Sequence, residues 1–224
     1  MKQPTLISAT LRVVSGLGFY SAILCIPAGT ISYIPGWIFI GTLATSFAVI
    51  MPFLYFRHPD AFQRRMRQQE KEKEQKLVIA LLAISGIGGF ILSGLDYRWG
   101  WSQMPLFVVV LANVFIALCM AGITWVTVIN EFAGKTVEVD DSQTVVSTGP
   151  YAVVCHPMYS FYIPLMLAIP IALGSYWAFP LFAIVVPIAL QMRMVNEEKV
   201  LLEELEGYEE YRSKVRWRVL PYLW

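Results

Sequence analysis

The chain alternates between long apolar stretches and short polar segments. Four stretches, at residues 11–34, 37–56, 77–95 and 104–129, are each long enough to cross a bilayer as a single helix. A fifth, at residues 158–192, exceeds one crossing and contains a Gly-Ser pair, aromatic residues and Pro180 near its middle. Because Gly-Ser favours a turn and aromatic residues favour the membrane interface, this stretch is predicted to form two helices. The pattern predicts an all-α, polytopic transmembrane helix bundle with five to six membrane helices.

Beyond the last apolar stretch, apolar residues recur at helical spacing opposite a charged face. They are Leu201, Leu202, Leu205 and Tyr208. This spacing predicts a single amphipathic helix over residues 193–214, which continues from the last span and lies against the bundle or the lipid headgroups. At the other terminus, the stretch 11–34 is too long for the core of a signal peptide, so we expect a first membrane helix there.

The composition supports a membrane protein and excludes other classes. The chain of 224 residues is 57% hydrophobic and 15% charged, with a mean hydropathy of +0.58, whereas soluble domains are about a quarter charged. A net charge of +1 gives no global basicity, so no nucleic-acid partner is expected. The three cysteines, Cys25, Cys119 and Cys155, form no CxxC pattern, so we expect neither a disulfide framework nor a metal site.

The distribution of Lys and Arg predicts how the chain is oriented in the membrane. The segment 57–76 is rich in both residues, and short cytoplasmic loops carry an excess of them. Counting six crossings outward from this segment places the N-terminus, the loop 130–155 and the tail after Gln191 in the cytoplasm, and the loop 96–103 outside. The tail is itself basic, so the count and the charges agree. We therefore expect a multi-pass membrane protein with its polar segments facing the cytoplasm.

Two polar clusters lie on the predicted cytoplasmic side, at residues 143–159 and 193–198. Arg193 and Glu197 are one helical turn apart, so they share a face and can pair with each other or hold a third group together. Spacing alone leaves open whether they are functional or extend to the membrane interface as ordinary charged side chains. Similarly, His156-Pro157 at a helix start indicates either a functional histidine or an interfacial one that is hydrogen bonded.

Three ordered motifs resemble a known family. The run from Thr148 to Tyr159 (TGPYAVVCHPMY) is followed by Arg193-x-x-x-Glu197-Glu198 and then by Gly207-Tyr208-x-x-Tyr211. In this order they resemble the isoprenylcysteine carboxyl methyltransferase and phospholipid methyltransferase family of integral membrane enzymes. The segments RWGWS at 98–102 and NEF at 130–132 are similar to bacterial members.

The resemblance covers residues 96–224. No internal repeat or low-complexity linker divides the chain, so we expect a single membrane domain, 1–224. Within it, residues 1–95 form the N-terminal helices and the charged loop, and residues 96–224 form a methyltransferase-like catalytic core.

The resemblance implies S-adenosyl-L-methionine as cofactor and assigns residues to it. The implied cofactor-binding residues are Gln143, Thr144, Val145, Val146, Tyr151, His156, Pro157, Met158, Tyr159 and Glu198. The implied catalytic residues, which serve the reacting end of the acceptor, are Arg193 and Glu197. Family members usually have Arg before His-Pro, whereas this chain has Cys155, so a cationic contact is expected to be missing there.

The resemblance therefore implies methyl transfer to a lipophilic acceptor at the cytoplasmic membrane face. A prenylcysteine-like carboxylate, a phospholipid amine and a small hydrophobic molecule all remain open as acceptors, and membrane lipids are the expected surroundings. The alternatives are a membrane reductase of sterol-like lipids, which would bind a nicotinamide cofactor, and a non-enzymatic carrier or scaffold. A carrier would show polar residues near mid-membrane. The central thirds of the apolar stretches are nearly free of charge, which favours an active site at one membrane face.

Overall fold

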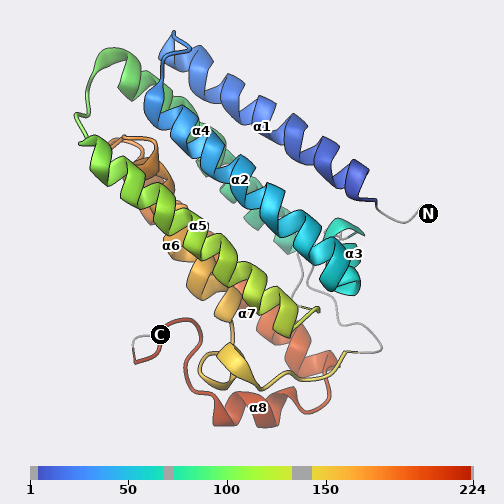
Figure 1. Ribbon diagram of the computed structural model, residues 1–224. Coiled ribbons are helices and arrows are strands. Elements are labelled where there is room, and N and C mark those ends of the chain that lie inside the picture. Colours follow the sequence, from blue (N-terminus) through green and yellow to red (C-terminus); the bar gives the residue numbers. More distant parts are fainter. Residues whose placement is uncertain (1–4, 68–72, 133–142, 223–224) are drawn as a thin grey trace.

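The structure is a computed structural model, which describes residues 5–67, 73–132 and 143–222 as a bundle of long helices (Figure 1). The helices are α1 (Leu6–Ala28), α2 (Ile34–Arg57), α3 (Pro59–Arg67), α4 (Lys73–Trp99), α5 (Leu106–Ile129), α6 (Pro157–Ala172), α7 (Phe179–Glu204) and α8 (Tyr208–Lys214), with a 3-10 turn at Gly149–Ala152. Over these residues the extended pairing is limited to an isolated parallel bridge between Val154 and Trp217. The all-α prediction is confirmed.

Five helices are long and apolar enough to cross a membrane, namely α1, α2, α4, α5 and α7. The most apolar is α5, with a mean hydropathy of 2.7. Its Val109 and Ile116 are buried, whereas Leu111, Phe115 and Leu118 are exposed. Water is a poor solvent for apolar surface that is exposed along whole helices, and lipid chains are a good one. The chain is thus a multi-pass membrane protein.

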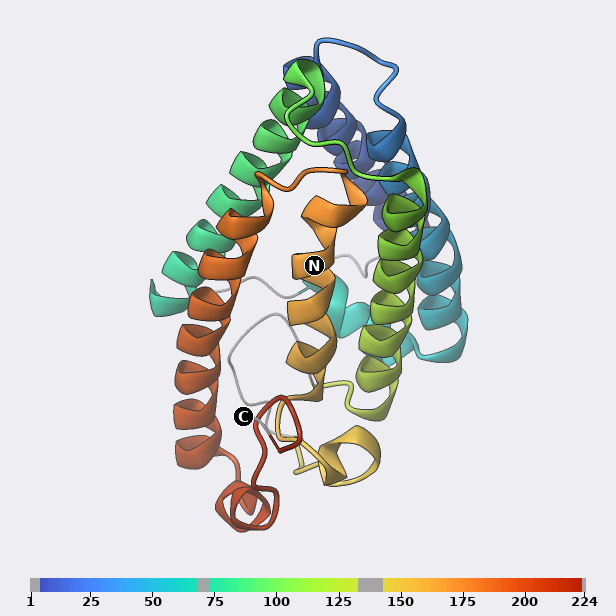
Figure 2. The same ribbon diagram turned by 90° about the vertical axis from the view of Figure 1, so that its left-hand side faces the viewer.

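The long apolar stretch divides into α6 and α7 as predicted. The chain turns at Gly174, whose φ of 73° lies in the left-handed region that favours glycine, and Pro180 lies in the first turn of α7. With 16 residues, α6 rises about 24 Å, which is less than the roughly 30 Å of a bilayer core. In Figure 2 it is the central helix, between α5 and α7. The structure therefore contains five full-length spans and a shorter apolar helix.

The structure differs from the predicted bounds of the first helix and of the last. The first helix begins at Leu6 rather than at residue 11, because Thr5 caps its start, and it ends at Ala28 rather than at residue 34, because Gly29 adopts a left-handed conformation that caps it. The predicted single helix over 193–214 is two helices. Gly207, with a φ of 81°, follows the break between α7 and α8, so the chain turns and Tyr208 and Tyr211 pack back against Tyr151 and Val126.

Polar side chains tie the loops together at the end of the bundle where α4 gives way to α5. Asp96 is buried and accepts hydrogen bonds from the backbone N–H of Ser102 at 2.7 Å and from the Ser102 hydroxyl at 2.6 Å. Asp96 also accepts one from the hydroxyl of Ser175, in the turn between α6 and α7. These bonds join two loops that are far apart in sequence.

The opposite end of the bundle gathers α3, α8, the start of α6 and the end of α7 (Figures 1 and 2). The segments predicted to share one side of the membrane therefore lie at the same end of the bundle. Arg12 of α1 reaches α3 there and donates a hydrogen bond to the carbonyl of Met66 at 3.2 Å.

Small residues let the helices approach closely, as is usual in membranes. Gly94 of α4 lies against α1, and a Cβ atom at this position would be 2.7 Å from the carbonyl oxygen of Leu24. Gly89 likewise lies against the ring of Phe182 in α7. The backbone carbonyl beside Gly94 cannot move without shifting α1.

We expect Gly94→Ala to destabilise the protein by about 1–3 kcal/mol, because the added methyl group clashes with backbone rather than with a flexible side chain. Thermal unfolding in detergent measures this. The matched control is Gly86→Ala on the same helix, where nothing lies within 4 Å of the new methyl group. That variant should unfold at the parent temperature or slightly above it. Equal effects of the two substitutions would contradict the close approach of α1 and α4.

Candidate functional site

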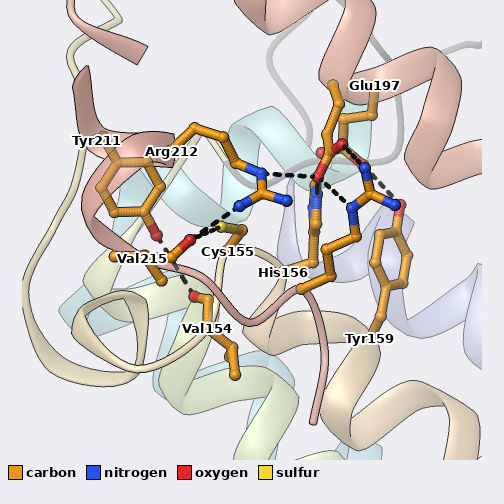
Figure 3. Close-up of polar contacts among 10 residues, drawn as sticks. Val154, Cys155, His156, Tyr159, Glu197, Tyr211, Arg212 and Val215 are labelled. Atoms are coloured by element: carbon orange, nitrogen blue, oxygen red, sulfur yellow. Dashed lines mark hydrogen bonds and ion pairs between the residues drawn. The ribbon is translucent and has the colours of Figure 1, made fainter. Parts of the chain in front are cut away.

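The two predicted polar clusters meet at one end of the bundle. His156 is the residue before α6, and its Nε2 lies 3.2 Å from Oε1 of Glu198 on α7. One turn further along α6, the hydroxyl of Tyr159 donates a hydrogen bond to Oε2 of Glu197 at 2.7 Å. The start of α6 lies beside the second half of α7, so the side chains of His156 and Tyr159 meet those of Glu198 and Glu197. Figure 3 shows Tyr159 pointing toward Glu197.

Arg193 and Glu197 hold the Tyr159 hydroxyl between them. The Nε of Arg193 donates to this hydroxyl at 2.9 Å, while the hydroxyl donates to Glu197. The shared helix face predicted for Arg193 and Glu197 is present, and the third group that they hold is a tyrosine. A hydroxyl that accepts from a guanidinium and donates to a carboxylate has a fixed orientation.

The carboxylate of Glu198 pairs with two arginines of the C-terminal tail. Arg218 donates to it twice, from Nε at 3.1 Å and from Nη2 at 2.9 Å, and the Nε of Arg212 lies 3.5 Å away. His156 approaches the same group, and Glu198 is only 8% exposed. A bidentate guanidinium on a buried carboxylate is a strong, charge-assisted hydrogen-bonded pair, although the Arg218 side chain is itself partly exposed. Glu198 therefore fixes the tail against the start of α6.

Backbone hydrogen bonds continue this docking. The N–H of Cys155 donates to the carbonyl of Trp217 at 2.9 Å, and that of His156 donates to the carbonyl of Arg218 at 2.8 Å. The thiol of Cys155 donates to the carbonyl of Val215 at 3.3 Å. The tail thus runs alongside the loop that leads into α6 (Figure 3).

A cleft opens beside these groups. It is lined by Asn130, Phe132, Gln143, Thr144, Val145, Val146, Tyr151, Cys155, His156, Met158, Tyr159, Glu197, Leu201, Leu205, Tyr208 and Tyr211. All the predicted cofactor residues except Pro157 and Glu198 are among them. Of the predicted catalytic pair, Glu197 lines the cleft and Arg193 reaches it through Tyr159. The assignment of these residues to a cofactor stays a prediction.

Four tyrosines line the cleft: Tyr151, Tyr159, Tyr208 and Tyr211. The hydroxyl of Tyr211 donates to the carbonyl of Tyr151 at 2.7 Å. The hydroxyl of Tyr208 is buried and has no hydrogen-bond partner in the part of the chain that the structure describes. Burial raises the pKa of both Tyr208 and Tyr211, so both stay protonated at neutral pH. The Tyr208 hydroxyl is a donor available to a ligand.

Cys155 occupies the position where the resembled family usually has arginine. Its side chain is buried, and burial raises the pKa of the thiol, although the nearby Arg212 opposes this shift. A raised pKa keeps the group protonated and weakly nucleophilic. Positive charge beside His156 is nevertheless present, because Arg212 and Arg218 supply it from the tail. Two arginines of the tail, Arg212 and Arg218, therefore supply the positive charge that an arginine at position 155 would have supplied.

Sequence reasoning did not assign these two arginines, nor several cleft-lining residues: Asn130, Phe132, Leu201, Leu205, Tyr208 and Tyr211. The signal for Tyr208 and Tyr211 was present in the motif Gly207-Tyr208-x-x-Tyr211. The sequence spacing of Arg212 and Arg218 does not predict their contact with Glu198, because only the folded chain brings the tail beside α7.

Comparison with known proteins supports the resemblance. Residues 104–206 match the model of the family described as phospholipid methyltransferase. The matched segment begins just before α5 and ends just after α7, so it includes the motifs of α6 and α7 but neither α1–α4 nor α8. Among curated proteins, none matches the chain in sequence.

We expect Glu198→Gln to loosen the tail, because the neutral amide leaves two guanidinium groups without their carboxylate. The loss should be about 2 kcal/mol, as for hydrogen bonds to charged groups. Thermal unfolding and the rate of tryptic cleavage within residues 212–218 measure it. Glu210→Gln is the control, since its pair with Lys214 is fully exposed and its loss should change neither quantity. Tail cleavage at the parent rate in Glu198→Gln would contradict the role of Glu198.

Proposed function

We propose that the protein transfers a methyl group from S-adenosyl-L-methionine to a lipophilic acceptor. The observation that carries this proposal is the Tyr159 hydroxyl, held between Arg193 and Glu197 at the edge of a cleft lined by the predicted cofactor residues. The match of residues 104–206 to phospholipid methyltransferases supports the reaction class. The exposed apolar helices support an acceptor that is dissolved in the membrane.

The cleft residues fit this cofactor chemically. Its sulfonium is a cation, and the cleft offers the Glu197 carboxylate together with tyrosine rings, whose faces attract cations. The amides of Asn130 and Gln143 and the Tyr208 hydroxyl, which has no partner among the described residues, can bind its polar groups. When bound, the cofactor supplies an electrophilic methyl group, and the protein's task is to position the acceptor and exclude water.

Arg193, Tyr159 and Glu197 act as a unit in this proposal. Arg193 carries a permanent positive charge that favours an anionic acceptor group such as a carboxylate. Glu197 orients the tyrosine hydroxyl or accepts a proton from a neutral acceptor. The prenylcysteine-like carboxylate, the phospholipid amine and the small hydrophobic molecule remain the candidate acceptors.

The site faces the cytoplasm in this proposal. The basic residues at the site end of the bundle include Arg57, Arg64 and Arg212, and short cytoplasmic segments carry such an excess. A water-soluble cofactor would enter the cleft from that side, while the acceptor would enter sideways from the bilayer.

The direct test uses the purified full-length protein, radiolabelled S-adenosyl-L-methionine and membrane lipid extracts. The proposal expects label to pass into a lipid fraction, whose chemical class then identifies the acceptor. A parallel binding measurement with a nicotinamide cofactor separates methyl transfer from the reductase alternative. Binding of the nicotinamide cofactor, without binding of S-adenosyl-L-methionine, would overturn the proposal.

We expect Arg193→Ala to lower kcat by about 100-fold or more, because the charged donor to the Tyr159 hydroxyl is removed. Cofactor affinity, measured by calorimetry in detergent, should change little, since Arg193 does not line the cleft. Arg216→Ala, an exposed arginine of the tail, is the control and should keep parent activity. Unchanged turnover in Arg193→Ala would remove Arg193 from the reaction.

Substitution of Tyr208 and of Tyr211 tests whether the cleft binds the cofactor. Tyr208→Phe removes a buried hydroxyl without a partner in the described chain, so the free protein should be as stable as the parent or more so. If this hydroxyl binds the cofactor, cofactor affinity should fall by about 10-fold. Tyr211→Phe should instead lower stability, because its hydroxyl bonds to the carbonyl of Tyr151. Parent cofactor affinity in Tyr208→Phe would exclude this contact.

A further inference from the structure

Arg65 brings a positive charge to the site from a part of the chain outside the family match. It lies on α3, the short helix that follows α2 after a break at His58. The NH2 group of Arg65 donates to the sulfur of Met158, 3.6 Å away on the first turn of α6. Met158 also lines the cleft. The guanidinium therefore lies on the α3 side of the cleft, near the side chain of Tyr151.

This guanidinium is poorly compensated. Its Nε is buried and has no hydrogen-bond partner within the described residues. A thioether sulfur is a weak acceptor, and no carboxylate pairs with Arg65 in the described part of the chain. Burial lowers the pKa of Arg65, yet a guanidinium remains charged at physiological pH. A partly buried guanidinium that has no carboxylate partner among the described residues is unfavourable there, so the protein keeps it at a cost in stability.

Neighbouring arginines differ from Arg65. Arg12 is exposed and bonds to the carbonyl of Met66, and Arg64 lies over the ring of Phe132 with 4.3 Å from its Cζ to the ring centre. Arg193 and Arg218 are engaged with Tyr159 and Glu198. Of the arginines near the cleft whose contacts are described, Arg65 has the weakest compensation.

We propose that Arg65 binds the anionic headgroup, a carboxylate or a phosphate, of the amphiphile that accepts the methyl group. This inference rests on the proposed function and narrows its acceptor to one that carries an anionic group beside the reacting atom. The position of α3 favours an amphiphile over a soluble anion. It directly follows the membrane-crossing α2, so an anion beside it lies at the depth of the headgroups while its chain extends along the exposed apolar helices.

The test measures binding to the purified full-length protein in a neutral detergent at pH 8. The probes are dodecyl phosphate and dodecanoate, with dodecanol as the neutral amphiphile and inorganic phosphate as the anion without a chain. We expect the two anionic amphiphiles to raise the unfolding temperature, and dodecanol and inorganic phosphate to leave it nearly unchanged. An equal rise with dodecanol, or an equal rise with inorganic phosphate at the same concentration, would overturn the proposal.

Substitutions connect this binding to Arg65. In Arg65→Met, the Kd for dodecyl phosphate should increase by about 10-fold or more. The free protein should unfold at the parent temperature or above it, because the substitution removes a partly buried guanidinium whose one printed hydrogen bond among the described residues is to a thioether. Arg65→Lys keeps the charge and should bind more tightly than Arg65→Met. Arg12→Met is the matched control and should bind like the parent. Parent affinity in Arg65→Met would exclude Arg65 from the headgroup site.

A cofactor measurement separates this inference from the proposed function. Arg65→Met should bind S-adenosyl-L-methionine with parent affinity, because Arg65 does not line the cleft. If the parent protein binds dodecyl phosphate through Arg65 but does not bind S-adenosyl-L-methionine, the proposed function fails while the anion site stands. If the cofactor binds and Arg65→Met keeps parent affinity for the anionic amphiphiles, the anion site fails alone.

Discussion

The buried carboxylate of Glu198 lies among an imidazole and two guanidinium groups, and the arrangement of the site depends on this one cluster. The carboxylate belongs to α7, the imidazole of His156 to the loop before α6, and the guanidiniums of Arg212 and Arg218 to the tail. Three separate segments therefore have to be in place before the charge is balanced. Because a buried carboxylate without its partners is strongly unfavourable, the cluster selects the arrangement in which tail, loop and helix all touch. Glu197, the next residue on α7, is thereby held beside Tyr159.

The membrane limits where such polar clusters can lie. Over the apolar lengths of the helices, close contacts depend on small residues such as Gly94 rather than on charged pairs. The clusters built on a buried carboxylate lie at the two ends, with Asp96 and its serine partners at one and Glu198 at the other. The first cluster joins the loop before α5 to the turn between α6 and α7, whereas the second borders the cleft. On the proposed function, the first cluster is structural and the second lies beside the reacting groups.

Much of the fold was predictable from sequence because apolar length and period report directly on membrane helices. The division between α6 and α7 followed from Gly174 and its aromatic neighbours, and the meeting of His156 with Glu198 agrees with a loop and a helix predicted on the same side. The break between α7 and α8 was missed, since the helical spacing of apolar residues continues through it. The left-handed conformation of Gly207 overrides that spacing, and a glycine near a helix end does not reveal from sequence which way the chain will turn.

The contacts of the individual arginines could not be predicted from the sequence. A basic run such as that of α3 has the same composition whether its side chains are solvated or directed inward, so Arg65 could not be distinguished from Arg64 by pattern. Tertiary contacts separate them: the guanidinium of Arg64 lies over an aromatic ring, whereas that of Arg65 donates to a methionine sulfur. The family match ends before Arg212 and begins after α4, so both Arg65 and the tail arginines come from outside it. On the proposed function, the matched segment supplies the cleft and the reacting groups, and the flanking segments supply the charges that orient them.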